Sequence, residues 1–115
     1  MIPKVVETIG ALGGDDVDFA VTTYLHFAHA EGNLALGPAG TWLVANENSR
    51  EMMKDDQVVN MVGLAALQEA YPASASPDIT YDPSMRFHIN SQTVDLMHFG
   101  PAHTTGDTAV YFREA

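Results

Sequence analysis

The first part of the chain has the residue pattern of a helix followed directly by that of a strand, and this order limits the possible fold classes. Apolar residues recur at helical spacing over residues 3–12, and Gly13-Gly14 then gives a typical helix stop. Residues 17–23 are rich in β-branched and aromatic side chains, which is typical of a short strand. Helix, glycine pair and strand in this order form an α/β connection, so we predict an α/β (α+β) fold.

Further runs extend this pattern along the chain. Strands are expected at residues 41–45, 85–89, 93–98 and 108–112, with a hairpin turn around Asn90-Ser91-Gln92. A helical turn is expected at residues 33–36, and composition favours a helix over residues 50–70 that Gly63 or the pair Asp55-Asp56 can split. A chain of 115 residues makes one domain at most, so residues 1–115 are expected to form one unit.

The charge balance excludes ordinary nucleic-acid binding. The chain has 15 acidic and 5 basic residues, a net charge of −10, and the basic residues are scattered. Phosphate binding needs clustered Lys and Arg, so neither nucleic acid nor an anionic membrane is an expected partner. The sequence has no cysteine, which excludes disulfides and thiolate metal sites. No apolar run reaches the roughly 18–20 residues of a membrane span, and we expect a cytoplasmic protein.

Three histidines lie in polar loops that follow predicted strands. His26 and His29 are three residues apart in the first loop, and His103 is in the second. Neighbouring strands of an α/β layer deliver such loops to the same sheet edge, where neutral imidazoles can bind Zn²⁺. The alternative interpretation is a surface histidine pair with local hydrogen bonds. His88 and His98 alternate with apolar residues, so they are expected to be strand residues and not ligands.

The order of residues in the two loops resembles two motifs of the metallo-β-lactamase-fold hydrolases. The run Tyr24-Leu25-His26-Phe27-Ala28-His29-Ala30-Glu31-Gly32-Asn33 is similar to the family's His-x-His-x-Asp-His loop. The run Gly100-Pro101-Ala102-His103-Thr104-Thr105-Gly106-Asp107 is similar to its next motif, a glycine-flanked turn with a further His ligand. The length of chain and the order of elements between the motifs also suit the family.

The resemblance implies an incomplete metal site. His26, His29 and His103 keep ligand positions, and Tyr24 stands where the family has its first His, as an unusual fourth ligand. Ala28 replaces the Asp of the loop, and the family's later Asp and His ligands fall outside these 115 residues. The expected cofactor is therefore Zn²⁺ at low occupancy or none, with weak or no hydrolytic activity. No catalytic residue is assigned.

The resemblance also implies roughly one half of an αββα sandwich, as a mixed sheet with helices on one face. The other face is then expected to be apolar and to pack against a second copy, forming a homodimer. The residues expected on this face are Phe19, Val21, Trp42, Val44, Val94, Leu96, Val110 and Phe112. Two functions compete on this basis: a metal-binding module of hydrolase lineage, and a non-catalytic, self-associating fragment or pseudoenzyme.

Overall fold

A computed structural model describes residues 2–14, 16–23, 30, 32–61, 64–100 and 106–114. Its elements, in chain order, are α1 (Ile2–Ala11), β1 (Phe19–Val21), α3 (Asn33–Leu36), β2 (Trp42–Asn46), α4 (Glu47–Met53), β3 (Gln57–Met61), β4 (Leu64–Gln68), the 3₁₀ turn η1 (Ala73–Ala75), β5 (Ile79–Tyr81), β6 (Ser84–Ile89), β7 (Gln92–Met97) and β8 (Ala109–Phe112). No described helix is long and apolar enough to cross a membrane.

The predicted helix stop after α1 is confirmed. The amide of Gly14 donates to the carbonyl of Ile9 at 2.9 Å, and Gly13 has a φ of 87°. Glycine adopts this left-handed conformation without the steric cost of a Cβ, so it ends the helix and turns the chain toward β1.

The first sheet is parallel, with strand order β1-β2-β5. Val44 in the central strand pairs with Val21 on one side and with Ile79 on the other. Parallel strands need crossover connections, and the segments holding α3 and α4 supply them here. Four consecutive residues of β2, from Leu43 to Asn46, are buried, as expected for a central strand covered on both faces.

The second sheet is antiparallel, with strand order β6-β7-β8. The predicted hairpin is confirmed: Ile89 pairs with Gln92 around the two-residue turn Asn90-Ser91. Both turn residues have positive φ values, 51° and 58°, the combination that matches the twist of a two-residue hairpin.

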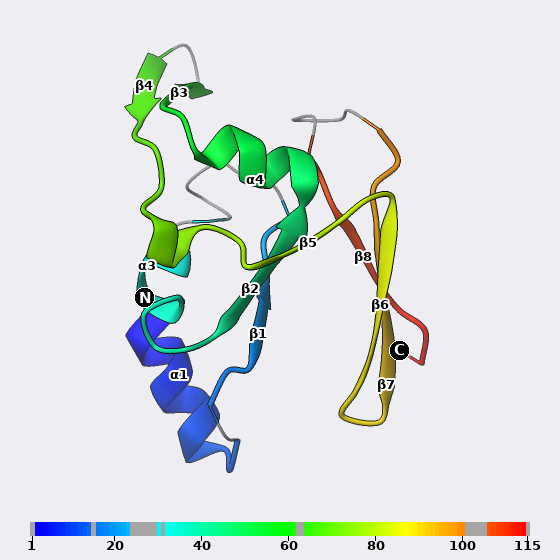
Figure 1. Ribbon diagram of the computed structural model, residues 1–115. Coiled ribbons are helices and arrows are strands. Elements are labelled where there is room, and N and C mark those ends of the chain that lie inside the picture. The colour runs from blue at the N-terminus through cyan, green and yellow to red at the C-terminus, as the bar shows by residue number, and fades with distance from the viewer. Residues whose placement is uncertain are drawn as a thin grey trace.

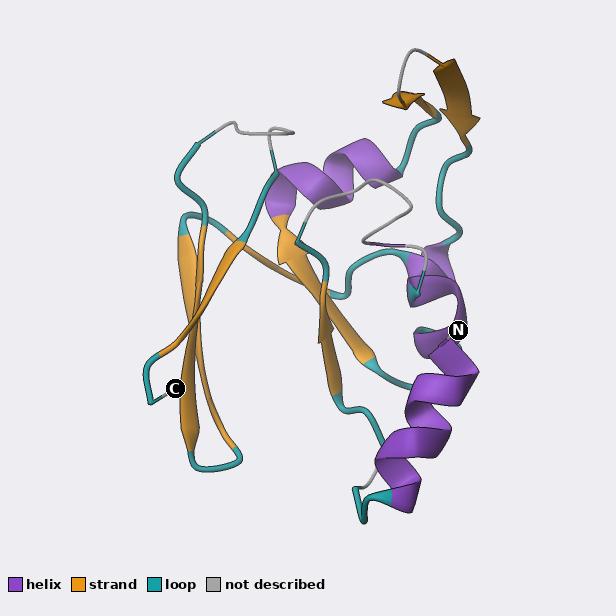
Figure 2. Cartoon of the chain, turned by 180° about the vertical axis from the view of Figure 1, so that it is seen from behind, coloured by secondary structure: helices purple, strands orange, loops and turns teal. Residues whose placement is uncertain are grey.

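The two sheets face each other and enclose the main core. Figure 1 shows α1 and α3 on one side of the parallel sheet and β6-β7-β8 on its other side, and Figure 2 shows the same layers from behind. The buried residues of this core are Val44, Tyr81, Val94 and Leu96. At its edge the rings of Phe19 and Phe87 lie 5.3 Å apart. The helices α1 and α3, the parallel sheet and the antiparallel sheet are therefore layered in this order, while α4 lies across one end of the sheets.

From the sequence, one apolar sheet face is expected to be left uncovered within the chain, and this core corrects that expectation. Val44, Val94 and Leu96 are buried within the chain itself, because β6 and β7 alternate apolar and polar residues and present an apolar face to the parallel sheet. The strands thus form two facing sheets, where one layer was expected. Of the residues expected on an exposed face, Phe19, Trp42, Val110 and Phe112 are exposed.

The predicted helix over residues 50–70 is wrong beyond α4. The helix ends at Met53, and β3 and β4 then form an antiparallel hairpin with Val58 opposite Leu67. The β-branched pair Val58-Val59 has low helix propensity and high strand propensity, and the acidic pair Asp55-Asp56 separates it from α4. The hairpin projects from the end of α4 in both views (Figures 1 and 2).

Candidate functional site

The four predicted metal ligands, Tyr24, His26, His29 and His103, lie outside the described residues. The structure instead describes the residues that flank their two loops. We call residues 24–29 the first loop and residues 101–105 the second loop. Among the described residues, no group of three or more His, Asp or Glu side chains is arranged to hold a metal ion.

The first loop is closed at its base by a buried amide. The side chain of Asn33, only 4% exposed, donates from Nδ2 to the Thr22 hydroxyl at 3.1 Å and to the carbonyl of Ala75 at 3.2 Å. Thr22 directly follows β1, and Asn33 begins α3. This pair therefore holds together the two segments on either side of the first loop. In the sequence, Asn33 is noticeable only as the last residue of the family-like run, and nothing there predicts a role for it.

The second loop returns to the described structure at Gly106, which packs against the first turn of α4. The Ser49 hydroxyl donates to the carbonyl of Gly106 at 2.8 Å, and Ser49 is fully buried. A Cβ at Gly106 would collide with the backbone nitrogen and Cα of Ser49. Only glycine allows this close approach, which explains its position in the motif.

The helix α4 that receives Gly106 is capped by Asn46. The Asn46 side chain accepts from the amide of Asn48 at 2.9 Å and donates to the carbonyl of Tyr81 at 3.2 Å. One buried side chain thus caps the helix and connects β2 to β5, which fixes the position of Ser49. The run Asn46-Glu47-Asn48-Ser49 predicts helix caps from its sequence, and Asn46 is the residue that caps α4.

A direct backbone bond joins the bases of the two loops. The amide of Thr108 donates to the carbonyl of Thr23 at 2.7 Å. The Thr108 hydroxyl also has a short hydrogen bond to the hydroxyl of Tyr81. Burial raises the pKa of Tyr81, so this phenol stays protonated. The residue before the first loop and the residues after the second loop therefore meet at one corner of the molecule.

The two remaining histidines occupy different environments. His88 is exposed in β6. His98 is half-buried just after β7, and its Nδ1 lies 2.9 Å from the carbonyl oxygen of Asp107. A carbonyl only accepts, so Nδ1 carries the proton in this contact. His98 thus fixes the backbone after the second loop from one position beyond the end of β7, whereas His88 is a strand residue as predicted.

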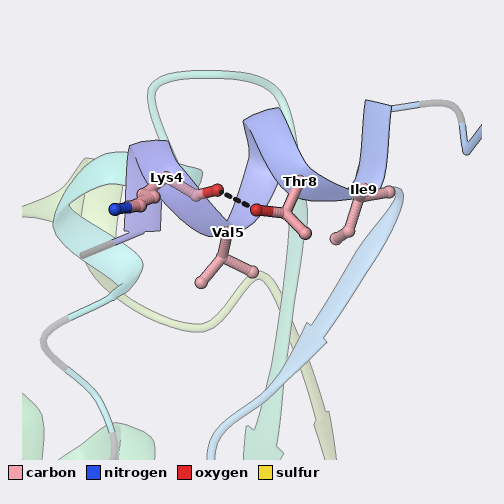
Figure 3. Close-up of a pocket in the computed structure, with 4 residues that line it drawn as sticks. All are labelled: Lys4, Val5, Thr8 and Ile9. Carbon is pink, nitrogen blue, oxygen red and sulfur yellow. Dashed lines mark hydrogen bonds between the residues drawn. The ribbon is translucent and has the colours of Figure 1, made fainter. Parts of the chain in front are cut away.

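Three surface hollows in the described part of the chain lie away from this corner, and that of about 670 Å³ lies at the end of α1, beside Phe19 and Asn90. Another, of about 300 Å³, is lined by Lys4, Val5, Thr8 and Ile9 on one face of α1 (Figure 3). The hydroxyl of Thr8, which lines this hollow, already donates a hydrogen bond to the carbonyl of Lys4 at 2.9 Å. This hollow is almost entirely apolar and holds none of the predicted site residues.

A third hollow has a volume of about 570 Å³, and Arg50 and Lys54 are among the residues that line it. Both cations already have partners: Arg50 donates from Nε to the carbonyl of Pro77 at 3.0 Å, and Lys54 pairs with Glu51 at 2.8 Å. None of the three hollows holds a group of His, Asp or Glu side chains arranged for a metal ion, so the candidate site remains the corner where the two loop bases meet.

Comparisons with known proteins agree with this architecture. No protein-family profile and no curated protein sequence matches the chain. A solved metallo-β-lactamase from Pontibacter korlensis covers 97% of the chain at 20% identity with a TM-score of 0.74, and the match spans 45% of that protein. A metallo-β-lactamase of Cronobacter sakazakii, described by its HARLDQ motif, covers 96% at 22% identity with a TM-score of 0.74, over 42% of its own length.

A subclass B3 metallo-β-lactamase from a soil metagenome library also matches, at 22% identity with a TM-score of 0.70 over 96% of the chain. The chain spans 42–45% of the length of these solved proteins. At such identities the likeness is one of fold. The α-β-β layering of this chain is the fold of part of a metallo-β-lactamase.

Proposed function

We propose that the chain is a metal-binding module of the metallo-β-lactamase fold, with Zn²⁺ held by His26, His29 and His103 and with Tyr24 as a fourth donor. The observation that carries this proposal is the 2.7 Å bond between the Thr108 amide and the Thr23 carbonyl. It joins the base of the loop that holds two of these histidines to the base of the loop that holds the third.

The donor set fits one zinc ion. Three imidazoles and a phenol offer nitrogen and oxygen ligands of the type that zinc accepts in four-coordinate sites. The loop bases are held by buried, satisfied polar groups, the Asn33 amide and the Ser49 hydroxyl, so ligands on both loops have firm anchors. Ala28 offers no carboxylate, and a second metal ion therefore lacks a ligand in the first loop.

The chemistry expected of the module is limited. Bound zinc lowers the pKa of a coordinated water and so supplies a nucleophile near neutral pH. In this chain the imidazoles bind the ion, while Ala28 leaves no carboxylate to orient an attacking water. We therefore expect weak or no hydrolysis. One of the matched structures is described as the first B3 metallo-β-lactamase with an active-site glutamic acid, so site residues vary among proteins of this fold.

Metal analysis tests the binding part of the proposal. After purification and equilibration with Zn²⁺, we expect bound zinc at no more than one ion per chain, and a double variant, His26→Ala with His103→Ala, should retain none above background. The matched control is His88→Ala, because His88 is exposed in β6 and away from both loops in sequence. Stoichiometric zinc in the double variant would show that the histidines are not the ligands.

Restoring the two altered positions tests the catalytic part. Tyr24→His combined with Ala28→Asp should raise zinc affinity, and hydrolysis of an activated ester or a β-lactam should rise only after that. The measurements are zinc titration and turnover with and without the metal. Robust zinc-dependent turnover by the unaltered protein would contradict the expectation of weak activity.

A second candidate function is a self-associating module without catalysis. It is favoured by β8, an edge strand whose residues are all exposed. The two candidates separate in one experiment: a protein that associates with itself but binds no zinc after equilibration supports the second.

A further inference from the structure

Within the described part of the chain, strand β8 is a sheet edge with no further strand beside it. It is last in the order β6-β7-β8, and its apolar residues Val110, Tyr111 and Phe112 are 38%, 55% and 51% exposed. Edge strands in soluble proteins are normally blunted by charges, proline, bulges or a covering segment, because their free backbone groups attract other strands. The residues Ala109–Phe112 include no charge and no proline.

The other edge of the same sheet has the protection that β8 lacks. Strand β6 includes Arg86 and His88, and both are exposed. The edge strand β1 of the parallel sheet is only three residues long, and a short strand offers few free groups. Strand β8 therefore lacks the charged residues that the opposite edge of its own sheet carries, as do the strands β3 and β4 of the separate hairpin.

The register shows which backbone groups of β8 are available. The Arg113 amide donates to the Thr93 carbonyl of the neighbouring strand, and the Thr108 amide donates away from that strand, to Thr23. Because backbone groups alternate in direction along a strand, those of Val110 and Phe112 point away from β7. Thr108 is already bonded, so the free stretch of the edge is centred on Tyr111.

We propose that β8 pairs antiparallel with β8 of a second copy, about a two-fold axis at Tyr111. This register sets Val110 opposite Phe112 of the other copy, twice, and gives four backbone hydrogen bonds in a closed, self-complementary contact. The two Tyr111 residues face each other at the axis as a non-hydrogen-bonded pair. The inference is independent of the metal proposed above, since no histidine takes part.

The charge distribution favours contact through this layer. The segment 84–114, which holds the antiparallel sheet, carries two basic and three acidic residues, a net charge of −1. The rest of the chain carries three basic and twelve acidic residues, a net charge of −9. Two copies that meet at β8 thus keep their acidic parts apart, whereas contact through the rest of the molecule brings like charges together.

The buried area sets the strength of the contact. Aromatic side chains bury about 200 Å² each when fully covered, so the half-exposed Tyr111 and Phe112 add about 100 Å² each. With Val110 and the backbone, the area stays well under the about 800 Å² per partner of a standard interface. The dimer therefore dissociates on dilution.

Cysteine cross-linking tests the register, because the chain has no cysteine of its own. A non-hydrogen-bonded pair has a Cα separation of about 4.5 Å, within the range of a disulfide, so Tyr111→Cys should form a covalent dimer with oxidised glutathione. The matched control is Ala109→Cys, on the same face of the same strand. Its two copies stand about 14 Å apart in this register and should not cross-link.

Sedimentation of variants without cysteine tests the association itself. The unaltered protein should shift from 12.4 kDa toward twice that mass between low-micromolar and sub-millimolar concentration, and Tyr111→Lys should stay monomeric with an unchanged circular dichroism spectrum. The control Leu12→Lys, at an 84% exposed apolar residue of another surface, should still dimerise. A monomer at every concentration, or equal cross-linking by Tyr111→Cys and Ala109→Cys, would overturn the proposal.

Discussion

Asp95 binds two arginines on the outer face of the antiparallel sheet. Its Oδ1 accepts from Arg86 Nε at 2.6 Å, and its Oδ2 accepts from Arg113 Nε at 2.8 Å. These hydrogen bonds, first from Arg86 and then from Arg113, hold the pKa of Asp95 below its ordinary value. One carboxylate in β7 thereby connects β6 to the end of β8, across all three strands of the sheet.

Asp95→Asn should lower the free energy of unfolding at neutral pH. In acid the difference between the variant and the unaltered protein should disappear. The lowered pKa means that the carboxylate stabilises the fold above the unfolded-state value of about 3.9, and that this contribution fades as the pH falls through the folded-state value. The urea midpoints of the variant and of the unaltered protein, compared across this pH range, measure the difference in stability. The control is Glu7→Gln, at an exposed residue of α1, and its urea midpoint should stay close to that of the unaltered protein. If the difference in midpoint between Asp95→Asn and the unaltered protein stays constant into strong acid, the linkage is contradicted.

The residues that build the candidate site differ in how far the sequence predicts them. His26 and His103 carry a motif, so they can be named without a structure. Among the residues at the loop bases, Asn33 ends the family-like run without a predicted role, and Ser49 and Thr108 belong to no motif. Their roles depend on partners that are distant in the sequence. Gly106 is the one available signal, since a glycine inside a polar motif indicates a close backbone approach.

At the scale of elements, local chemistry predicts the helix stop, the cap and the hairpin turn, and it fails between residues 54 and 70. The first three depend on a few neighbouring residues, such as Gly13 or Asn90-Ser91. The hairpin of β3 and β4 projects with Val58 and Leu67 both 66% exposed, so it lacks the alternation of buried and exposed residues that identifies a strand. Composition alone could not separate it from a helix.

This exposure predicts that Val58→Lys leaves stability within about 0.5 kcal/mol of the unaltered protein, as for other surface substitutions. Val58 contributes little buried area, and a charge on the hairpin meets water. Leu43→Ala, in a fully buried residue of β2, should in contrast cost about 2–5 kcal/mol. Chemical denaturation measures both, and a large loss for Val58→Lys would mean that the hairpin packs against another surface.

For the whole molecule, the resemblance predicts the fold and the single helix layer, but it misplaces the sheets. The sequence contains enough apolar strand surface for two sheet faces, and only long-range pairing decides that they cover each other. The cluster of Val44, Val94 and Leu96 joins β2 to β7, and the strands β3 to β6 lie between these two in the chain. No local pattern encodes that contact, so the inner face was expected to be open.

The position of Leu96 turns this correction into a test. Leu96 is fully buried between the sheets, so Leu96→Glu should unfold the protein and not merely separate two copies. A buried, unpaired carboxylate costs several kcal/mol, a large share of the stability of a domain this size. Circular dichroism and sedimentation together decide the outcome: a folded monomer of this variant would place Leu96 in a contact between copies.

The bond between Thr23 and Thr108 also governs when the site can form during folding. Its partners lie toward opposite ends of the sequence, so the loop that it closes includes most of the chain. Contacts of such long separation are slow to form, because the loop-closure entropy must be overcome before they stabilise anything. On the ribosome, the first loop emerges long before β8 exists. Its histidines therefore spend the period of synthesis without the second loop, and the proposed metal site can be completed only late in biogenesis.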